Sequence, residues 1–210
     1  LDDTLFVVVS EGEWVKFMDQ TNLIKDSNFF TKMENFENNY RQGKLDVDEY
    51  SEFLLSPIIG ISLEELENSI EIFSSDIVQR FTDNLTKDLL QKHKEDTKIL
   101  TSGSLSFLVN KIALKLGIEI SFGTDPEYLD GLFTGKVKGY PNFSEEKVRR
   151  IKFWMDSEQF DEIFSYSDSI HDLPLLEFSD FPIAISPDSK LRVIAQERNW
   201  PIYDRRDSYS

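Results

Sequence analysis

The segment 164–176 constrains the fold more than any other part of the chain. Small and apolar residues at 164–167 lead into a cluster of acidic residues, and an apolar helical run follows. This order is typical of a buried parallel strand that ends at the rim of an active site. Asp168 and Asp172 are four residues apart, so one turn can bring both carboxylates to a single point, where a cation would stabilise them. The alternative is that Asp168 or Ser169 caps a helix, with Asp172 near the positive end of the helix dipole.

The second half of the chain alternates between strand and helix patterns. We predict strands at 97–101, 118–122, 164–167 and 181–186, with a helix at 85–94 before the first strand and helices at 108–116 and 148–155 between later ones. Asp130-Gly131 separates two further extended runs, as in a β-hairpin, and the polar residues 102–104 form a tight turn. Alternation of this kind predicts an α/β fold with a doubly wound, Rossmann-like parallel sheet.

Residues 11–82 have a helical pattern throughout. The clearest helix begins at a capping box formed by Ser62 and Glu65, and its apolar stripe recurs in steps of three and four up to Phe81. A helical block of this length predicts a small bundle with its own core. We therefore divide the chain into an α/β core domain, residues 1–10 and 83–210, and an inserted helical domain, residues 11–82.

Charge and composition narrow the class of ligand. The formal net charge of −16 disfavours binding to nucleic acids or to an anionic membrane, because both need a basic surface. The chain has no Cys and only two His residues, which excludes disulfides and thiolate metal sites and favours a hard cation such as Mg²⁺. No apolar run is long enough to span a bilayer and the start has no signal-peptide pattern, so we expect a cytoplasmic protein.

In a parallel sheet, ligands bind beyond the carboxyl ends of the strands. The residues predicted there are Asp2, Asp3, Ser102, Gly103, Ser104, Lys147, Asp168 and Asp172. A hydroxyl group, backbone N–H groups and an ammonium group suit a phosphate dianion, and carboxylates opposite them suit Mg²⁺. Phosphate and metal side by side indicate phosphoryl transfer. Taken singly, Ser102 could instead cap a helix, and Lys147 could be a solvated surface residue.

Four short motifs, in this order and spacing, resemble those of the haloacid dehalogenase-like phosphatases. They are Asp2-Asp3-Thr4-Leu5, Ser102-Gly103-Ser104, Lys147, and Ser167-Asp168-Ser169-Ile170-His171-Asp172. Residues 40–50, 130–135 and 199–201 are similar to the branch that includes phosphoserine phosphatase, and the resemblance covers nearly the whole chain. It implies a Rossmann-like α/β core with an α-helical cap domain inserted between the first two motifs.

The resemblance also implies roles for individual residues. The family's general acid/base falls on Asp2, whose backbone carbonyl would also bind Mg²⁺. The phosphate-binding groups fall on Ser102 and Gly103. The charge-neutralising lysine, which binds the phosphate and takes part in catalysis, falls on Lys147.

In this family the acidic motif supplies the metal site. Asp168 would be a Mg²⁺ ligand, and Asp172 would either join the metal site or support Lys147. His171 stands where the family often has Asn, so a contact with substrate or phosphate differs. The family's nucleophilic Asp would directly precede Leu1, and the chain does not contain it. We therefore expect the native protein to have a further segment, with the nucleophile and its strand, before Leu1.

The function that the resemblance implies is hydrolysis of a small-molecule phosphate monoester by a Mg²⁺-dependent phosphatase, through an aspartyl-phosphate intermediate. One alternative is an inactive relative that binds phosphate compounds, or acts as a scaffold, without turnover. Another is a calcium-binding module, because residues 38–49 imitate part of an EF-hand loop, although their candidate ligands supply little charge. The sequence leaves the phosphate ester and the oligomeric state open.

Overall fold

The computed structural model describes residues 1–2, 4–6, 8–156 and 160–205. Its α-helices are α1 (Ser10–Gln20), α2 (Phe29–Arg41), α3 (Val47–Leu55), α4 (Leu63–Phe81), α5 (Asn84–Lys92), α6 (Ser106–Lys115), α7 (Glu145–Met155), α8 (Leu173–Phe178) and α9 (Ser189–Glu197), and its 3₁₀ helices are η1 (Ser56–Ile58) and η2 (Ile170–Asp172). Its strands are β1 (Ile99–Leu105), β2 (Ile120–Thr124), β3 (Pro126–Leu129), β4 (Leu132–Val137), β5 (Phe164–Ser167), β6 (Phe181–Ile185) and β7 (Ile202–Tyr203). No helix in this described part of the chain is both long enough and apolar enough to cross a membrane.

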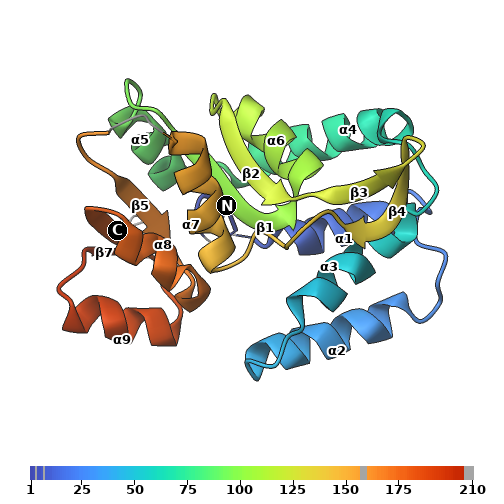
Figure 1. The fold of residues 1–210 in the computed structure, drawn as a ribbon, viewed down its shortest axis with the longest axis horizontal. Coiled ribbons are helices and arrows are strands. Elements are labelled where there is room, and N and C mark those ends of the chain that lie inside the picture. The colour runs from blue at the N-terminus through green and yellow to red at the C-terminus, as the bar shows by residue number, and fades with distance from the viewer. Residues whose placement is uncertain (3, 7, 157–159, 206–210) are drawn as a thin grey trace.

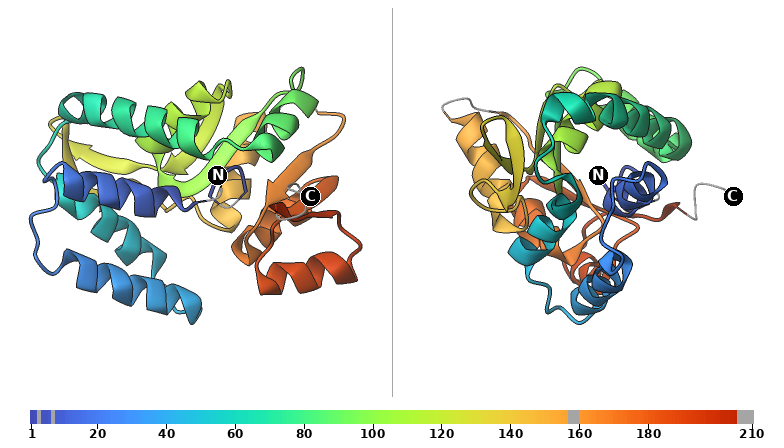
Figure 2. Two further views of the ribbon diagram at one scale, coloured as in Figure 1. Left: turned by 180° about the vertical axis from the view of Figure 1, so that it is seen from behind. Right: turned by 90° about the vertical axis from the view of Figure 1, so that its right-hand side faces the viewer.

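The parallel strands form two half-sheets. Strands β1 and β2 make the first half-sheet, and β5, β6 and β7 make the second, with parallel pairing in both. The half-sheets lie on either side of the N-terminus (Figure 1 and Figure 2). This parallel pairing, with helices between successive strands, agrees with the predicted α/β class.

A cavity of about 650 Å³ separates the two half-sheets. Its walls include Leu100 and Thr101 of β1 and Phe164 and Tyr166 of β5, and Leu1 also lines it. Among the described residues no strand joins β1 to β5, so the continuous sheet that the sequence predicts is in two parts. Residues of both strands line the cavity, and β1 and β5 do not pair with each other.

Helices α1 to α4 share their core with the α/β part of the chain, so the predicted separate bundle core is wrong. Trp14 of α1 packs its ring against Phe73 of α4, at a centroid distance of 5.1 Å, and against Phe107 of α6, at 6.2 Å. The reason is that the apolar stripe of α4 packs against α6, which makes one continuous apolar cluster. The capping box of Ser62 and Glu65 at the start of α4 is confirmed. The boundary of the helical domain at residues 11–82 stays a prediction.

The segment 102–104 lies within β1, so the predicted tight turn is wrong. The pairing of β1 with β2 shifts register between Thr101 and Leu105, which interrupts the ladder while the chain stays extended. Helix α6 begins at Ser106 with Leu105 at its N-cap. This removes the alternative that Ser102 caps the helix.

Two further predictions concern the β-hairpin turn at residues 130–131 and the EF-hand-like segment at residues 38–49. The hairpin is confirmed, because β3 and β4 pair antiparallel and the turn residues Asp130 and Gly131 have φ angles of 52° and 82°. The EF-hand loop is not formed. Asn38 and Tyr40, two of its candidate ligands, lie inside α2, and the side chain of Asp46 caps α3.

Candidate active site

A buried ion pair between α7 and η2 marks the centre of the candidate active site. The Lys147 ammonium group donates to Oδ1 of Asp172 at 2.6 Å, and the Ser167 hydroxyl donates to Oδ2 at 2.8 Å. Burial alone would raise the pKa of Asp172, but the charge and hydrogen bond of Lys147, with the Ser167 hydroxyl, lower it. The carboxylate is therefore ionised at neutral pH and holds the ammonium group in place.

Asp2 lies beside the polar residues of β1. Its Oδ1 accepts a hydrogen bond from the backbone N–H of Ser10 at 2.5 Å. Its Oδ2 accepts from the hydroxyl groups of Ser102, at 3.3 Å, and Ser104, at 3.4 Å. The fold thus brings together Asp2 and Ser102, the predicted acid/base and the predicted phosphate-binding hydroxyl.

Asp168 and Leu1 lie in the same region. The Thr4 hydroxyl donates to Oδ1 of Asp168 at 2.5 Å. The charges of Asp2, Lys147, Asp168 and Asp172 all act on the backbone nitrogen of Leu1. These four predicted site residues therefore lie in the region of Leu1, and Leu1 and Asp172 both line the cavity between the half-sheets.

Gly103, the remaining predicted phosphate-binding residue, lies next to the loop before α7. A Cβ atom at Gly103 would lie 3.9 Å from the carbonyl oxygen of Asn142 and 3.9 Å from Cδ2 of Phe143. The Gly103 carbonyl accepts a hydrogen bond from the Thr124 hydroxyl at 2.5 Å, which ties this part of β1 to β2. Asp3, also predicted at the site, lies outside the described residues.

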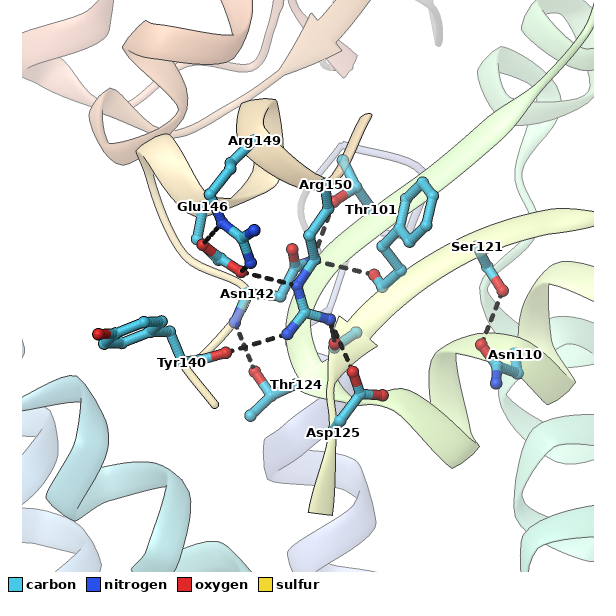
Figure 3. Close-up of polar contacts among 12 residues, drawn as sticks. Thr101, Asn110, Ser121, Thr124, Asp125, Tyr140, Asn142, Glu146, Arg149 and Arg150 are labelled. Atoms are coloured by element: carbon cyan, nitrogen blue, oxygen red, sulfur yellow. Dashed lines mark hydrogen bonds and ion pairs between the residues drawn. The ribbon is translucent and has the colours of Figure 1, made fainter. Parts of the chain in front are cut away.

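Asn142 fixes the loop that leads to Lys147, and the sequence motifs do not include this residue. Its buried side-chain amide donates to Oγ1 of Thr101 at 2.9 Å and to the carbonyl oxygens of Ser102, at 2.8 Å, and Phe122, at 3.0 Å. Figure 3 shows this amide between the loop and the strands. A single Asn in a loop has no distinguishing sequence signal, because its partners are 20 to 41 residues away.

Arg150, on the first turns of α7, fixes the helix that carries the catalytic lysine candidate (Figure 3). Its guanidinium group donates to the carbonyl oxygen of Gly123 at 2.8 Å and to the carboxylate of Asp125 at 2.9 Å. It also donates to Glu146 at 3.0 Å and to the carbonyl of Tyr140 at 3.0 Å. These bonds hold the start of α7 against the end of β2.

Glu11 is a further carboxylate near Asp2 that the sequence does not single out. The hydroxyl group of Tyr50, on α3, donates to its Oε2 at 3.1 Å. Burial, and after it the charge of Asp2, raises the pKa of Glu11 to about 7. Acidic residues are common in the first turn of a helix, so the sequence alone gives no reason to expect a raised pKa for this one.

The donor chemistry of the site fits Mg²⁺, because Asp2 and Asp168 offer the hard oxygen ligands that this ion prefers. Within the described ranges, however, no group of three His, Asp or Glu side chains lies close enough together to hold a metal ion. Both carboxylate oxygens of Asp172 contact Lys147 and Ser167. Of the two roles predicted for Asp172, support of Lys147 therefore agrees better with the geometry than direct metal binding.

Comparison with known proteins gives relatives over the whole length of the chain. The sequence is 29% identical to a histidinol-phosphatase of Neisseria meningitidis, over 96% of this chain and 95% of that protein. It is 32% identical to the phosphoserine phosphatase SerB1 of Mycobacterium tuberculosis, over 65% of this chain and 45% of that protein. These relatives support the predicted phosphoserine phosphatase-like branch.

Solved structures have the same fold. A protein of Bordetella pertussis, described as having unknown function, is 33% identical, with a TM-score of 0.88 over 97% of this chain and 95% of that one. A phosphoserine phosphatase structure has a TM-score of 0.65 and 18% identity, over 97% of this chain and 90% of that one. The predicted α/β fold is confirmed. The model of the haloacid dehalogenase-like hydrolases matches residues 1–177, and the chain belongs to this family, as its four motifs predict.

Proposed function

We propose that this protein is a Mg²⁺-dependent phosphatase that hydrolyses a phosphate monoester of a small metabolite through an aspartyl-phosphate intermediate. The observation that carries the proposal is the buried ion pair of Lys147 with Asp172, together with the hydrogen bond from Ser102 to Asp2. Asp168, which accepts from Thr4, lies in the same region. These groups are three carboxylates and one ammonium group, and the hydroxyl of Ser102 beside Asp2 is buried. This arrangement suits a phosphate dianion and a divalent cation side by side.

The phosphate would bind at the end of β1 and the start of α7. The Ser102 hydroxyl and the backbone N–H of Gly103 would donate hydrogen bonds to its oxygens, and the Lys147 ammonium group would neutralise its charge. Asp172 holds that ammonium group at 2.6 Å, so the positive charge is in place before the substrate arrives. Asp2 would give a proton to the leaving oxygen and later take one from the attacking water.

Asp168 and the backbone carbonyl of Asp2 would hold Mg²⁺. When bound, the ion would neutralise charge on the phosphate and orient it. Thr4 donates to one oxygen of Asp168, which fixes the orientation of the carboxylate.

The nucleophile of an aspartyl-phosphate mechanism must be a carboxylate directed at this same point. The position expected for it, directly before Leu1, would face the site, because the charges of Asp2, Lys147, Asp168 and Asp172 act on the Leu1 nitrogen. A strand leading into Leu1 would lie between β1 and β5, and the cavity of about 650 Å³ between them offers room for it. We propose that an Asp at this position forms the intermediate.

The substrate proposed is a small phosphate ester. The support comes from two relatives, whose names give histidinol-phosphatase and phosphoserine phosphatase activities. The net charge of −16 disfavours a nucleic-acid substrate. The hydroxyl of Tyr50, on the helical segment, bonds Glu11 near Asp2, so the helices reach the site, where they would exclude water and bind the leaving group.

The test is phosphate release from a panel of phosphate monoesters, with and without Mg²⁺. The assay uses protein in which an Asp directly precedes Leu1, which we call the Asp protein. The matched control, the Asn protein, has Asn at that position. We expect Mg²⁺-dependent release of phosphate from the Asp protein and loss of release from the Asn protein. Binding of inorganic phosphate with no turnover of any ester by the Asp protein would instead identify an inactive relative.

A further inference from the structure

Three aromatic rings from three separate segments meet at the junction of the helical segment with the α/β part. The imidazole ring of His171, in η2, lies 4.8 Å from the ring of Phe143, in the loop before α7. It lies 5.4 Å from the ring of Tyr40, in α2. We call these three residues the aromatic cluster. The chemistry proposed above gives them no role.

The aromatic cluster borders the groups proposed to bind phosphate. Phe143 would be 3.9 Å from a Cβ atom at Gly103, and His171 directly precedes Asp172. The Ser169 side chain, in the same acidic motif, forms a hydrogen bond with the Tyr40 hydroxyl, and the charges of Asp168, Asp188 and Asp172 also act on that hydroxyl. A phosphate held by Gly103 would therefore have the aromatic cluster next to it, on the side of α2.

The rings offer a surface that suits a planar apolar group. Tyr40 is 46% exposed, which leaves part of its ring open to a ligand. Aromatic rings prefer offset or edge-to-face contacts with other rings, and such contacts contribute more than the buried area alone.

We propose that Tyr40, Phe143 and His171 form the subsite for the leaving group, and that this subsite takes a planar aromatic or heteroaromatic ring joined to the phosphate by a short linker. The proposal rests on the phosphatase function proposed above. It goes further by naming the chemical class of the ester.

The first test compares two phosphates of similar shape, 2-phenylethyl phosphate and 2-cyclohexylethyl phosphate, with Mg²⁺ and the Asp protein. The aromatic ester should have a kcat/KM about two- to tenfold higher, the range expected for one ring contact. Tyr40→Leu and Phe143→Leu keep apolar bulk but remove the ring, and both should abolish the preference. Tyr203→Leu, which removes an exposed ring on β7, should keep it.

Two outcomes of this comparison would overturn the proposal. One is equal kcat/KM for the two esters in the unaltered protein. The other is a loss of kcat/KM in the Tyr40 and Phe143 variants that is the same for both esters, because the rings would then only hold α2 against the α/β part.

A binding measurement separates this proposal from the proposed function. Calorimetry with 2-phenylethylphosphonate and 2-cyclohexylethylphosphonate, which cannot be hydrolysed, uses the 210-residue chain itself. If no ester is hydrolysed but the phenyl phosphonate binds more tightly, and Phe143→Leu removes the difference, the function fails and the aromatic subsite stands. Equal affinity for the two phosphonates would overturn the subsite whatever the activity.

Discussion

The two half-sheets differ in what packs against them. The first half-sheet belongs to a large apolar cluster that continues into the helical segment and includes Trp14, Phe107 and Ile112. The cluster on the second half-sheet is small, and its buried members are Leu176, Ala184, Leu191 and Ala195. Because apolar burial is the main stabilising term in folding, we infer that the first half-sheet and the helical segment form the more stable region.

Polar contacts connect the region of the second half-sheet to α7 and to the N-terminal residues. The ion pair of Lys147 and Asp172 is one, and the bond from Thr4 to Asp168 is another. The side chain of Arg205 donates to the carbonyl oxygen of Thr4 and to the carboxylate of Asp83, the N-cap residue of α5. The proposed reactive groups therefore lie where the more stable region, the first half-sheet with the helical segment, meets the second half-sheet. Movement of the second half-sheet would change the site without unfolding the first.

The largest effect is expected from removing the lysine of the ion pair. Lys147→Met should lower kcat about 10²- to 10³-fold in the Asp protein, because the charge that faces the phosphate is lost. It should also lower the free energy of unfolding by about 3–5 kcal/mol, because Asp172 is left as an unpaired buried charge. Urea unfolding and phosphate release measure the two effects.

A double variant separates the two roles of this pair. Lys147→Met with Asp172→Leu should recover much of the lost free energy of unfolding without recovering turnover, because an apolar pair replaces the unpaired charge. A single Lys147→Met variant with turnover within threefold of the unaltered protein would contradict the proposed role.

The next largest effect tests the difference between the half-sheets directly. Ile112→Ala, in the large apolar cluster, should lower the free energy of unfolding by about 4 kcal/mol, because the cavity left in a continuous core cannot collapse. Leu191→Ala, in the small cluster, should cost about 2 kcal/mol, because its surroundings can relax. Both residues are fully buried, which makes them a matched pair. Equal costs in urea unfolding would break the comparison.

Glu11 gives a pH-dependent effect of intermediate size. Its pKa is raised from 4.5 to about 7 in the folded protein, so the folded state binds the proton more tightly than the unfolded state. This contribution to stability is fully present below about pH 4.5 and is lost as the pH rises through about 7. Relative to Glu11→Gln, the unaltered protein should lose about 3 kcal/mol across this window. Parallel pH profiles of urea unfolding for the two proteins would argue against a buried Glu11.

The smallest effect concerns the loop before α7. Asn142→Ala removes the amide that bonds β1 and β2, and we expect a loss of about 2 kcal/mol because buried carbonyl groups lose their donor. The control is Asn110→Ala, which removes an exposed contact with Ser121 and should change the free energy of unfolding by less than about 0.5 kcal/mol. A loss for Asn110→Ala as large as that for Asn142→Ala would show that the loop contact has no special importance.

Sequence patterns predicted the site best where local order and function coincide. Asp168 directly follows β5, so the strand pattern alone placed it at a carboxyl end. Ser102 lies beside Asp2 although its local structure is predicted wrongly, because motif order does not depend on whether the segment is a turn or a strand. Its role in binding phosphate stays a prediction. Helix α9 was missed, although the Asp188 side chain accepts from the N–H groups of its first turn.

Residues positioned by tertiary packing could not be predicted. Glu11, Asn142 and Tyr40 each take their environment from partners far away in sequence, such as Tyr50 for Glu11 and His171 for Tyr40. Residue type and local spacing do not record such contacts. The shared core was missed for the same reason, since the stripe of α4 shows which face is buried but not that α6 covers it.

The central claim is that the charged groups around Leu1 form a metal-dependent phosphatase site, and Asp168 tests it most directly. The measurement is the Mg²⁺ dependence of phosphate release by the Asp protein and by the same protein with Asp168→Asn, alongside the melting temperature of each. The substitution keeps the size of the side chain and removes its charge, so we expect loss of Mg²⁺-dependent turnover with little change in melting temperature. Full Mg²⁺-dependent turnover by the Asp168→Asn protein would contradict the account.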